Sequence, residues 1–445
     1  MFFRKTSRAI GVHPRQNKST QGMAFVRVDG FSRLTIPLNL QVGPGCSALV
    51  KKGDEVKVGQ RIGEPLGHWS VPAHSSVSGT VTEVKKDILS SGDVADLIVI
   101  QSDGKQTLDE SIKPPVVNDK ESFLAAIRNA GLVGLGGAAF PTHVKLDPPE
   151  GKVIDTLVIN GAECEPRITA DDQLMRDRAD RVVAGINLVC HYLDIPRCVI
   201  GIEDNKPEAI AAMQKAVDAT GSEHKAAISV VTLKTLYPTG AEKVLIRYLT
   251  DRIVPENGLP ADVGVVVLNV GTVAFIADII DTGMPLIRKF VTIDGSAMAK
   301  SGNYDLPIGA PIEDIIEKVG GTKVPVGKIV MGGPMMGVSI DDTLHPVLKH
   351  TNSLLVANEK DATIPKESNC IHCGRCSKHC PMQLMPTDLD MAARRENVEE
   401  LREYHVMNCI ECGCCTFVCP AKRYLVQNIR IGKNLWRQAK KKEAK

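Results

Sequence analysis

The sequence has few aromatic residues, little net charge and no long apolar run. Aromatic residues make up 4% of the 445 residues and the formal net charge is +2. Such a chain offers neither stacking platforms for single-stranded nucleic acid nor a strong field toward polyanions, so we expect no nucleic-acid partner. The longest uncharged apolar run, 263–277, is shorter than the about 20 residues that a membrane-spanning helix needs. Any membrane contact is therefore expected to be peripheral.

Cysteine, by contrast, is abundant and unevenly placed. Nine of the 13 cysteines lie between Cys370 and Cys419, and the N-terminus lacks the apolar core of a secretory signal. A tightly clustered, odd set of cysteines without an export signal argues against a disulfide framework. The pattern indicates metal ligation in a reducing compartment.

Eight of the clustered cysteines form two copies of the spacing C-x2-C-x2-C-x3-C-P. The copies comprise Cys370, Cys373, Cys376 and Cys380, and then Cys409, Cys412, Cys415 and Cys419. In bacterial ferredoxins the last cysteine of each such motif serves the cluster of the other motif. We therefore predict two [4Fe–4S] clusters, one on Cys370, Cys373, Cys376 and Cys419, and one on Cys409, Cys412, Cys415 and Cys380. Paired zinc knuckles are the alternative, but zinc has no use for this repeated spacing. Cys414 is predicted to be a spectator.

Two further regions are rich in β-like runs. Residues 1–115 alternate such runs with turns, which is typical of a small β barrel-sandwich of the biotinyl/lipoyl type. The segment 73–76 lacks the lysine that carries a swinging-arm cofactor in such modules, so we interpret the module as structural. Residues 287–350 surround one amphipathic segment, 312–319, and are predicted to form a small β-grasp domain.

Between these regions, residues 116–286 alternate expected strands and helices. Short strands, apolar on both faces, are expected at 156–160, 198–202, 227–233 and 263–270, and helices at 121–130, 174–193, 207–219 and 240–249. This pattern is typical of a parallel sheet covered by helices. The predicted fold class is thus multidomain α/β, with an α-helical dicluster ferredoxin domain over 360–430 and a basic tail over 431–445.

A glycine-rich loop, GLGGAAFPTHVK at 134–145, follows the first expected helix. Gly134, Gly136 and Gly137 let backbone N–H groups approach a phosphate or a flat ring, and Lys145 could neutralise its charge. Because the loop follows a helix, it is not a strand-to-helix Rossmann turn. A tightly packed turn without a ligand is the alternative interpretation.

This loop is the first of four motifs that occur in one order. The others are NGAECEP at 160–166, YPTGAEK at 237–243 and NVGT at 269–272. Together with the paired cysteine motifs, they resemble the RnfC family, a component of the Rnf electron-transport complex. The segments GVHP at 11–14 and MGGPMMG at 331–337 extend this resemblance over the whole chain. The middle of the chain is also similar to the FMN- and NADH-binding subunit of respiratory complex I.

The resemblance implies an FMN held non-covalently by the glycine loop, with NADH stacked on it. The implied flavin residues are Gly134, Gly136, Gly137, Lys145, Asn160, Asn269 and Thr272. Those implied to face the dinucleotide are Phe140, Glu165, Tyr237 and Glu242, with Glu163 and Gly240 in the same motifs. The chain departs from complex I at Leu135, Ala139 and Cys164, where complex I has Arg, Gly and Ser. No catalytic acid–base residue is expected.

The resemblance also implies a place in a membrane complex that couples ferredoxin:NAD⁺ electron transfer to Na⁺ or H⁺ movement. The implied partners are a ferredoxin-like iron–sulfur subunit and integral membrane subunits, which would hold the chain at the cytoplasmic face of the membrane. A flavin suits this work because it exchanges hydride with nicotinamide and single electrons with clusters. Two alternatives are a cluster-carrying relay or docking subunit without flavin or NADH chemistry, and a reductase of a regulatory iron–sulfur protein.

The C-terminal end is strongly basic. Nine Lys and Arg residues and one acidic residue lie in 422–445. Such a segment is either a solvated charged end or a docking surface for an acidic partner or the lipid headgroups.

Overall fold

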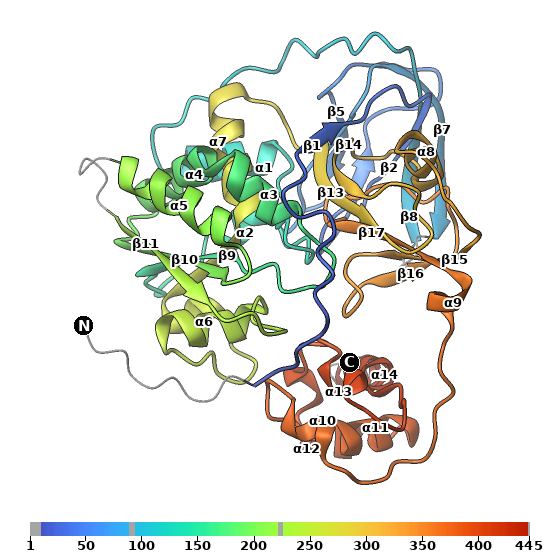
Figure 1. Cartoon of the computed structure of the whole chain (residues 1–445). Coiled ribbons are helices and arrows are strands. Elements are labelled where there is room, and N and C mark those ends of the chain that lie inside the picture. The colour runs from blue at the N-terminus through green and yellow to red at the C-terminus, as the bar shows by residue number, and fades with distance from the viewer. Residues whose placement is uncertain (1–9, 89–93, 221–225, 444–445) are drawn as a thin grey trace.

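The computed structural model describes residues 10–88, 94–220 and 226–443 of the chain. A β module and a second β sheet lie beside a central α/β domain, and a helical domain holds the C-terminus (Figure 1). In the described part of the chain, we find no helix that combines the length and apolar character of a membrane span.

The N-terminal module consists of two antiparallel sheets. The four-stranded sheet has the order β2 (Arg33–Pro37), β8 (Val94–Ser102), β7 (Gly79–Ile88), β4 (Glu55–Val56). The three-stranded sheet has the order β3 (Cys46–Ala48), β5 (Arg61–Pro65), β6 (Ala73–His74). Alternate side chains such as Leu34, Ile36, Ile98 and Ile100 are fully buried between the strands. This alternation is the physical basis of the predicted β barrel-sandwich.

The second β region is a six-stranded mixed sheet, which is called the second β sheet from here on to distinguish it from the two sheets of the β module. Its order is β1 (Phe25–Arg27), β14 (Gly302–Pro307), β13 (Arg288–Asp294), β17 (Ser353–Asn358), β15 (Val326–Met331), β16 (Val338–Ile340), with α8 (Ile312–Lys318) beside it. The first strand pairs in parallel with β14, so residues near the N-terminus belong to this sheet rather than to the β module. The sheet also extends past residue 350, because β17 forms its centre.

The central domain has the parallel sheet predicted from the alternating pattern. Its order is β11 (Ala227–Leu233), β10 (Arg197–Glu203), β9 (Thr156–Gly161), β12 (Val265–Asn269). The helices are α1 (Lys120–Asn129), α2 (Thr142–Lys145), α3 (Ala170–Asp177), α4 (Ala179–Tyr192), α5 (Pro207–Ala219), α6 (Glu242–Thr250) and α7 (Val270–Thr282), with a 3₁₀ turn η1 (Pro260–Val263). Figure 1 shows α6 on one side of the sheet and α4 and α5 on the other.

Two elements of this domain differ from the predictions. The expected helix 174–193 is interrupted at Arg178, whose φ of −135° is not helical. The expected strand 263–270 ends at Asn269, where the Asn269 side chain accepts a hydrogen bond from Gly271 N at 2.8 Å and begins α7. The pattern concealed α7 because its first two turns carry no charged residue and are almost wholly buried, and its charged residues Asp278 and Asp281 come only near its end.

The C-terminal domain is helical between the cysteine motifs, as predicted, and also after them. A short helix α9 (Glu359–Ala362) leads to α10 (Arg375–Lys378), α11 (Pro386–Arg394), α12 (Val398–Glu403), the 3₁₀ turn η2 (Val406–Asn408), α13 (Cys414–Phe417) and α14 (Leu425–Glu443). The predicted boundary of the basic tail falls inside α14. Leu435 and Trp436 pack against the small core that contains Leu401 and Ile429, so this half of the helix is not a free end.

The contact between α4 and α7 sets the position of α7. A Cβ on Gly185 of α4 would lie 1.8 Å from the Val273 carbonyl oxygen of α7, so the two backbones approach too closely for any side chain there. We expect Gly185→Ala to destabilise the chain by about 1–3 kcal/mol, because the helices must separate. Thermal unfolding monitored by circular dichroism checks this. Ala184→Gly is the control, with the smaller cost of about 1 kcal/mol for glycine in a helix; equal effects would contradict the close approach.

Candidate functional site

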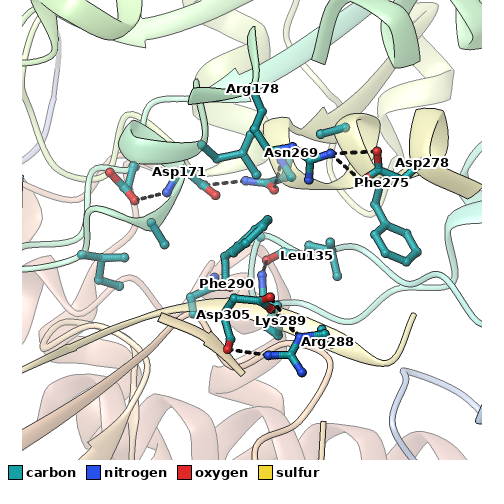
Figure 2. A pocket seen from close by; sticks show the side chains of 18 of the residues that line it. Leu135, Asp171, Arg178, Asn269, Phe275, Asp278, Arg288, Lys289, Phe290 and Asp305 are labelled. Carbon is teal, nitrogen blue, oxygen red and sulfur yellow. Dashed lines mark hydrogen bonds and ion pairs between the residues drawn. The ribbon is translucent and has the colours of Figure 1, made fainter. Parts of the chain in front are cut away.

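A cavity of about 760 Å³ lies between the central helices and the six-stranded sheet. In Figure 2, Phe275 and Asp278 of α7 lie on one wall, and Lys289 and Phe290 of β13 on the facing wall. Its volume is in the range of cofactor pockets, about 300–1,000 Å³.

The cavity brings together seven of the predicted cofactor residues. They are Gly136, Asn160, Glu163, Glu165, Tyr237, Gly240 and Asn269. The Asn160 side chain donates a hydrogen bond to the Gly240 carbonyl oxygen at 2.8 Å, which ties β9 to the loop before α6. A Cβ on Gly136 would lie 3.3 Å from Asn269 Cβ, so the glycine loop runs close against the first turn of α7.

The other predicted cofactor residues do not line this cavity. They are Gly134, Gly137, Phe140, Lys145, Glu242 and Thr272. The Lys145 ammonium forms an ion pair with the Glu242 carboxylate. The Thr272 hydroxyl oxygen accepts a hydrogen bond from Leu135 N at 3.0 Å and so holds the backbone of the glycine loop against α7. The Phe140 ring packs edge-on against Trp69 of the β module, with centroids 5.3 Å apart.

Glu165 ties the 331–337 segment to the cavity. Its carboxylate accepts hydrogen bonds from Met335 N at 3.1 Å and from Met336 N at 2.9 Å. Burial raises the pKa of Glu165 to about 7. A Cβ on Gly333 would lie 2.2 Å from Glu165 Oε2, so the segment reaches the carboxylate because residue 333 has no side chain.

Glu163 has a different environment at the start of α3. Its carboxylate accepts hydrogen bonds from Asp171 N at 2.7 Å and Asp172 N at 3.3 Å, and Lys18 Nζ lies 3.9 Å away. Burial raises the pKa of Glu163. These contacts give Glu163 a role in anchoring α3 and the N-terminal segment beside the cavity.

Several residues that line the cavity were not identified as cofactor residues from the sequence. They are Leu135, Asp171, Arg178, Phe275, Asp278, Arg288, Lys289, Phe290 and Asp305. Most belong to α7, the second β sheet and the residues around α3, outside the four motifs. One signal was available, because Lys289 lies in register with the buried apolar residues Val291 and Ile293 of β13.

The cysteines of the second motif surround a smaller pocket. Its lining includes Cys409, Cys412 and Cys415, together with Cys380, the last cysteine of the first motif. Cys414 also lines it and is fully buried. Among the residues that the structure describes, no three His, Cys, Asp or Glu side chains converge on one ion position. A [4Fe–4S] cluster takes its four thiolates at different irons, and four cysteines of the predicted set line this pocket.

The cysteines of the other predicted set are more exposed. Cys376 and Cys419 pack with Leu425 and Val426, whereas Cys373 is exposed and Cys370 partly exposed. The first motif therefore faces outward, and the second motif faces the rest of the protein. The ligand roles of all eight cysteines stay predictions.

Tyr237 connects the cavity to the second cysteine motif. Its hydroxyl donates a hydrogen bond to the Cys412 carbonyl oxygen at 2.7 Å, and Glu165 Oε1 lies 3.5 Å from the same hydroxyl. Burial raises the pKa of Tyr237, so the phenol keeps its proton. Cys164 and Cys414 complete this buried contact.

Four family models match the chain. They are the RnfC barrel sandwich hybrid domain over 7–105, the Nuo51 FMN-binding domain over 127–278, the SLBB domain over 290–339 and a 4Fe-4S dicluster domain over 369–422. These matches confirm the predicted fold class and the flavin and iron–sulfur cofactors. An FMN-binding domain joined to a dicluster domain defines the class of flavin- and iron–sulfur-containing electron-transfer proteins.

Two relatives match almost the whole chain. The C component of the Na⁺-translocating ferredoxin:NAD⁺ oxidoreductase complex of Acetobacterium woodii is 45% identical over 95% of both chains. Its proton-translocating counterpart from Clostridium ljungdahlii is 43% identical over 97% of this chain and 94% of its own. The chain belongs to the RnfC family, whose members are subunits of ion-translocating ferredoxin:NAD⁺ oxidoreductase complexes. An NAD⁺-reducing [NiFe]-hydrogenase structure is 18% identical with a TM-score of 0.49, covering 72% of this chain and 63% of that one.

Removal of the Tyr237 hydroxyl tests the contact between the domains. We expect Tyr237→Phe to speed hydrogen exchange around Cys412 roughly tenfold, since an unpaired buried carbonyl costs about 1–3 kcal/mol. Tyr304→Phe is a matched control, because the buried Tyr304 hydroxyl has no hydrogen-bond partner among the described residues. Mass spectrometry of exchanged peptides measures both variants. Unchanged exchange around Cys412 in Tyr237→Phe would show that the hydroxyl does not hold this contact.

Proposed function

We propose that this chain transfers electrons between NAD(H) and a partner protein, as the flavin- and iron–sulfur-carrying subunit of an ion-translocating ferredoxin:NAD⁺ oxidoreductase complex. One observation carries the proposal. The wall of the large cavity between the FMN-binding domain and the six-stranded sheet is hydrogen-bonded, through Tyr237, to Cys412 of the dicluster domain. Such contact is what a protein needs when it joins hydride chemistry to single-electron transfer.

The cavity fits an FMN in size and in chemistry. A flavin supplies a ring system that accepts hydride from nicotinamide and releases electrons singly. Gly136 and Gly240 would let the backbone approach the flat ring, and Asn160 and Asn269 would present amide groups to it. Glu165 would hold the 331–337 segment against the cavity and so limit the access of water.

The two predicted sets of four cysteines lie in different surroundings, one beside the cavity and one nearer the surface. Cys409, Cys412, Cys415 and Cys380 would hold the cluster next to the cavity, and Cys370, Cys373, Cys376 and Cys419 the cluster nearer the surface. The outward position of the first motif suits docking of a ferredoxin-like partner subunit. Integral membrane subunits would then hold the chain peripherally at the cytoplasmic face of the membrane, where the complex moves Na⁺ or H⁺.

Anaerobic addition of NADH to the purified, cofactor-loaded chain tests the proposed reaction. We expect the flavin absorption band to bleach with a stoichiometric amount of NADH, because the dinucleotide delivers hydride to the flavin. NADH with boiled protein is the control for spontaneous reduction. A chain that retains no FMN, or whose FMN is not bleached, would favour the relay subunit without flavin chemistry.

Iron and sulfide analysis tests the cysteine assignment. The two predicted clusters require about eight irons and eight sulfides per chain. We expect Cys380→Ser to damage the cluster of the second motif and Cys419→Ser that of the first, as read by electron paramagnetic resonance. Cys414→Ser is the matched control and should leave both signals intact. Zinc in place of iron, or damage confined to the motif that carries the substitution, would contradict the assignment.

The basic end of α14 is proposed to help attach the chain to its membrane complex. Lys440, Lys441 and Lys442 lie in the last turn, beyond the packed Trp436. We expect replacement of these three lysines by glutamate to reduce co-sedimentation with membranes at low salt, because each contributes about 1 kcal/mol near an anionic surface. Cluster absorbance is the control and should not change. If the wild-type chain and the variant bind membranes equally well at low and at high salt, attachment must involve another surface.

A further inference from the structure

The cavity contains one cationic side chain that differs from the others. Its three arginines are each ion-paired to an aspartate, namely Arg27 to Asp29 at 2.7 Å, Arg178 to Asp278 at 2.8 Å and Arg288 to Asp305 at 2.9 Å. Figure 2 shows the last two pairs on opposite walls. The fourth cation, Lys289, forms no ion pair with a carboxylate within 4.0 Å in the described part of the chain, and its Nζ donates to a backbone carbonyl instead.

Lys289 is also the most deeply buried of these cations. It is 7% exposed, and among the described residues its Nζ has one hydrogen-bond acceptor, the Leu135 carbonyl oxygen at 3.0 Å. Burial lowers the pKa of Lys289 to about 8, so the side chain still carries most of its charge near neutral pH. A buried, incompletely paired ammonium is costly, and an anion in the cavity would offset this cost.

The surroundings of Lys289 favour an anion at one end of the cavity. Leu135 lies between Lys289 and α7, since its carbonyl accepts from Lys289 and its N–H donates to Thr272. Asn269 and Gly271, at the N-terminus of this 13-residue helix, line the same cavity. A helix N-terminus presents a positive dipole end to an anion, although the Gly271 N–H itself already donates to Asn269 Oδ1.

Asp171 is the acidic group that faces this end of the cavity. Its carboxylate accepts a hydrogen bond from Asn269 Nδ2 at 2.7 Å. Burial raises the pKa of Asp171, and the positive charge of Lys289 opposes this shift. Asp171 therefore compensates part of the Lys289 charge from beyond ion-pair distance. Lys145, which the resemblance places on the flavin, is ion-paired to Glu242 and does not line the cavity.

We propose that Lys289, from the second β sheet, binds the phosphate monoester of the flavin cofactor against the N-terminus of α7. The proposal rests on the proposed function, because it takes FMN as the occupant of the cavity. It assigns the phosphate to a residue outside the FMN-binding domain. The second β sheet would then take part directly in cofactor binding and would not be a mere support.

Flavin-binding measurements on the deflavinated full chain, with its clusters in place, test this assignment. Flavin fluorescence gives the dissociation constants of FMN and of riboflavin, which lacks the phosphate. For Lys289→Met we expect FMN binding to weaken about ten- to a hundredfold, as for the loss of a charged hydrogen bond. Riboflavin binding should change less than about twofold, because it has no phosphate to lose.

Lys349→Met is the matched control. Lys349 is also buried, its pKa is also lowered to about 8, and its Nζ donates to the Pro72 and Gly131 carbonyl oxygens away from the cavity. This variant should keep the wild-type ratio of FMN to riboflavin affinity. In the wild-type chain, inorganic phosphate should compete with FMN and not with riboflavin, a measurement that does not depend on the folding of a variant.

Three results would overturn the assignment. Equal weakening of FMN and riboflavin in Lys289→Met would mean that the lysine is structural. Selective loss of FMN in Lys145→Ala, with Lys289→Met unaffected, would return the phosphate to Lys145. A raised KM for NADH with unchanged FMN affinity in Lys289→Met would place a dinucleotide phosphate at this lysine. Failure of the wild-type chain to bind either flavin would instead contradict the proposed function.

Discussion

The hydrogen bond from the Tyr237 hydroxyl to the Cys412 carbonyl oxygen joins the two halves of the proposed electron-transfer unit. Several contacts of the cavity wall meet at the same tyrosine. Glu165 lies beside its hydroxyl and holds the 331–337 segment, which in turn packs against the second cysteine motif through Met335. Three segments far apart in the sequence thus meet at one buried contact.

The charges of the cavity follow a simple rule. Cations on its walls are neutralised by neighbouring aspartates, whereas Lys289 donates to the glycine loop and keeps capacity for an anion. The largely apolar lining suits a flat ring, and the end at Lys289 and α7 suits a phosphate. A cofactor with one apolar and one anionic end matches this division.

The features that could be predicted from the sequence are those that depend on patterns within short segments. Cysteine spacing identified the dicluster domain, and alternating apolar runs identified the parallel sheet, because both signals lie within short segments. Helix α7 was missed, since its first two turns are buried and carry no charged residue that would mark a polar face. The register of Lys289 with Val291 and Ile293 signals an inward position, but its partner Leu135 lies 154 positions away, and no local pattern records such a contact. Lys145 was assigned by resemblance, and its ion pair with Glu242 became visible in three dimensions.

The central claim is that the cavity and the cysteine domain form one electron-transfer unit. Electron paramagnetic resonance of the isolated, FMN-loaded chain after anaerobic addition of NADH tests it most directly. The account predicts that signals of reduced iron–sulfur clusters develop with NADH alone, in the absence of any partner subunit. Clusters that remain oxidised with NADH, although dithionite reduces them and the flavin is bleached, would contradict it.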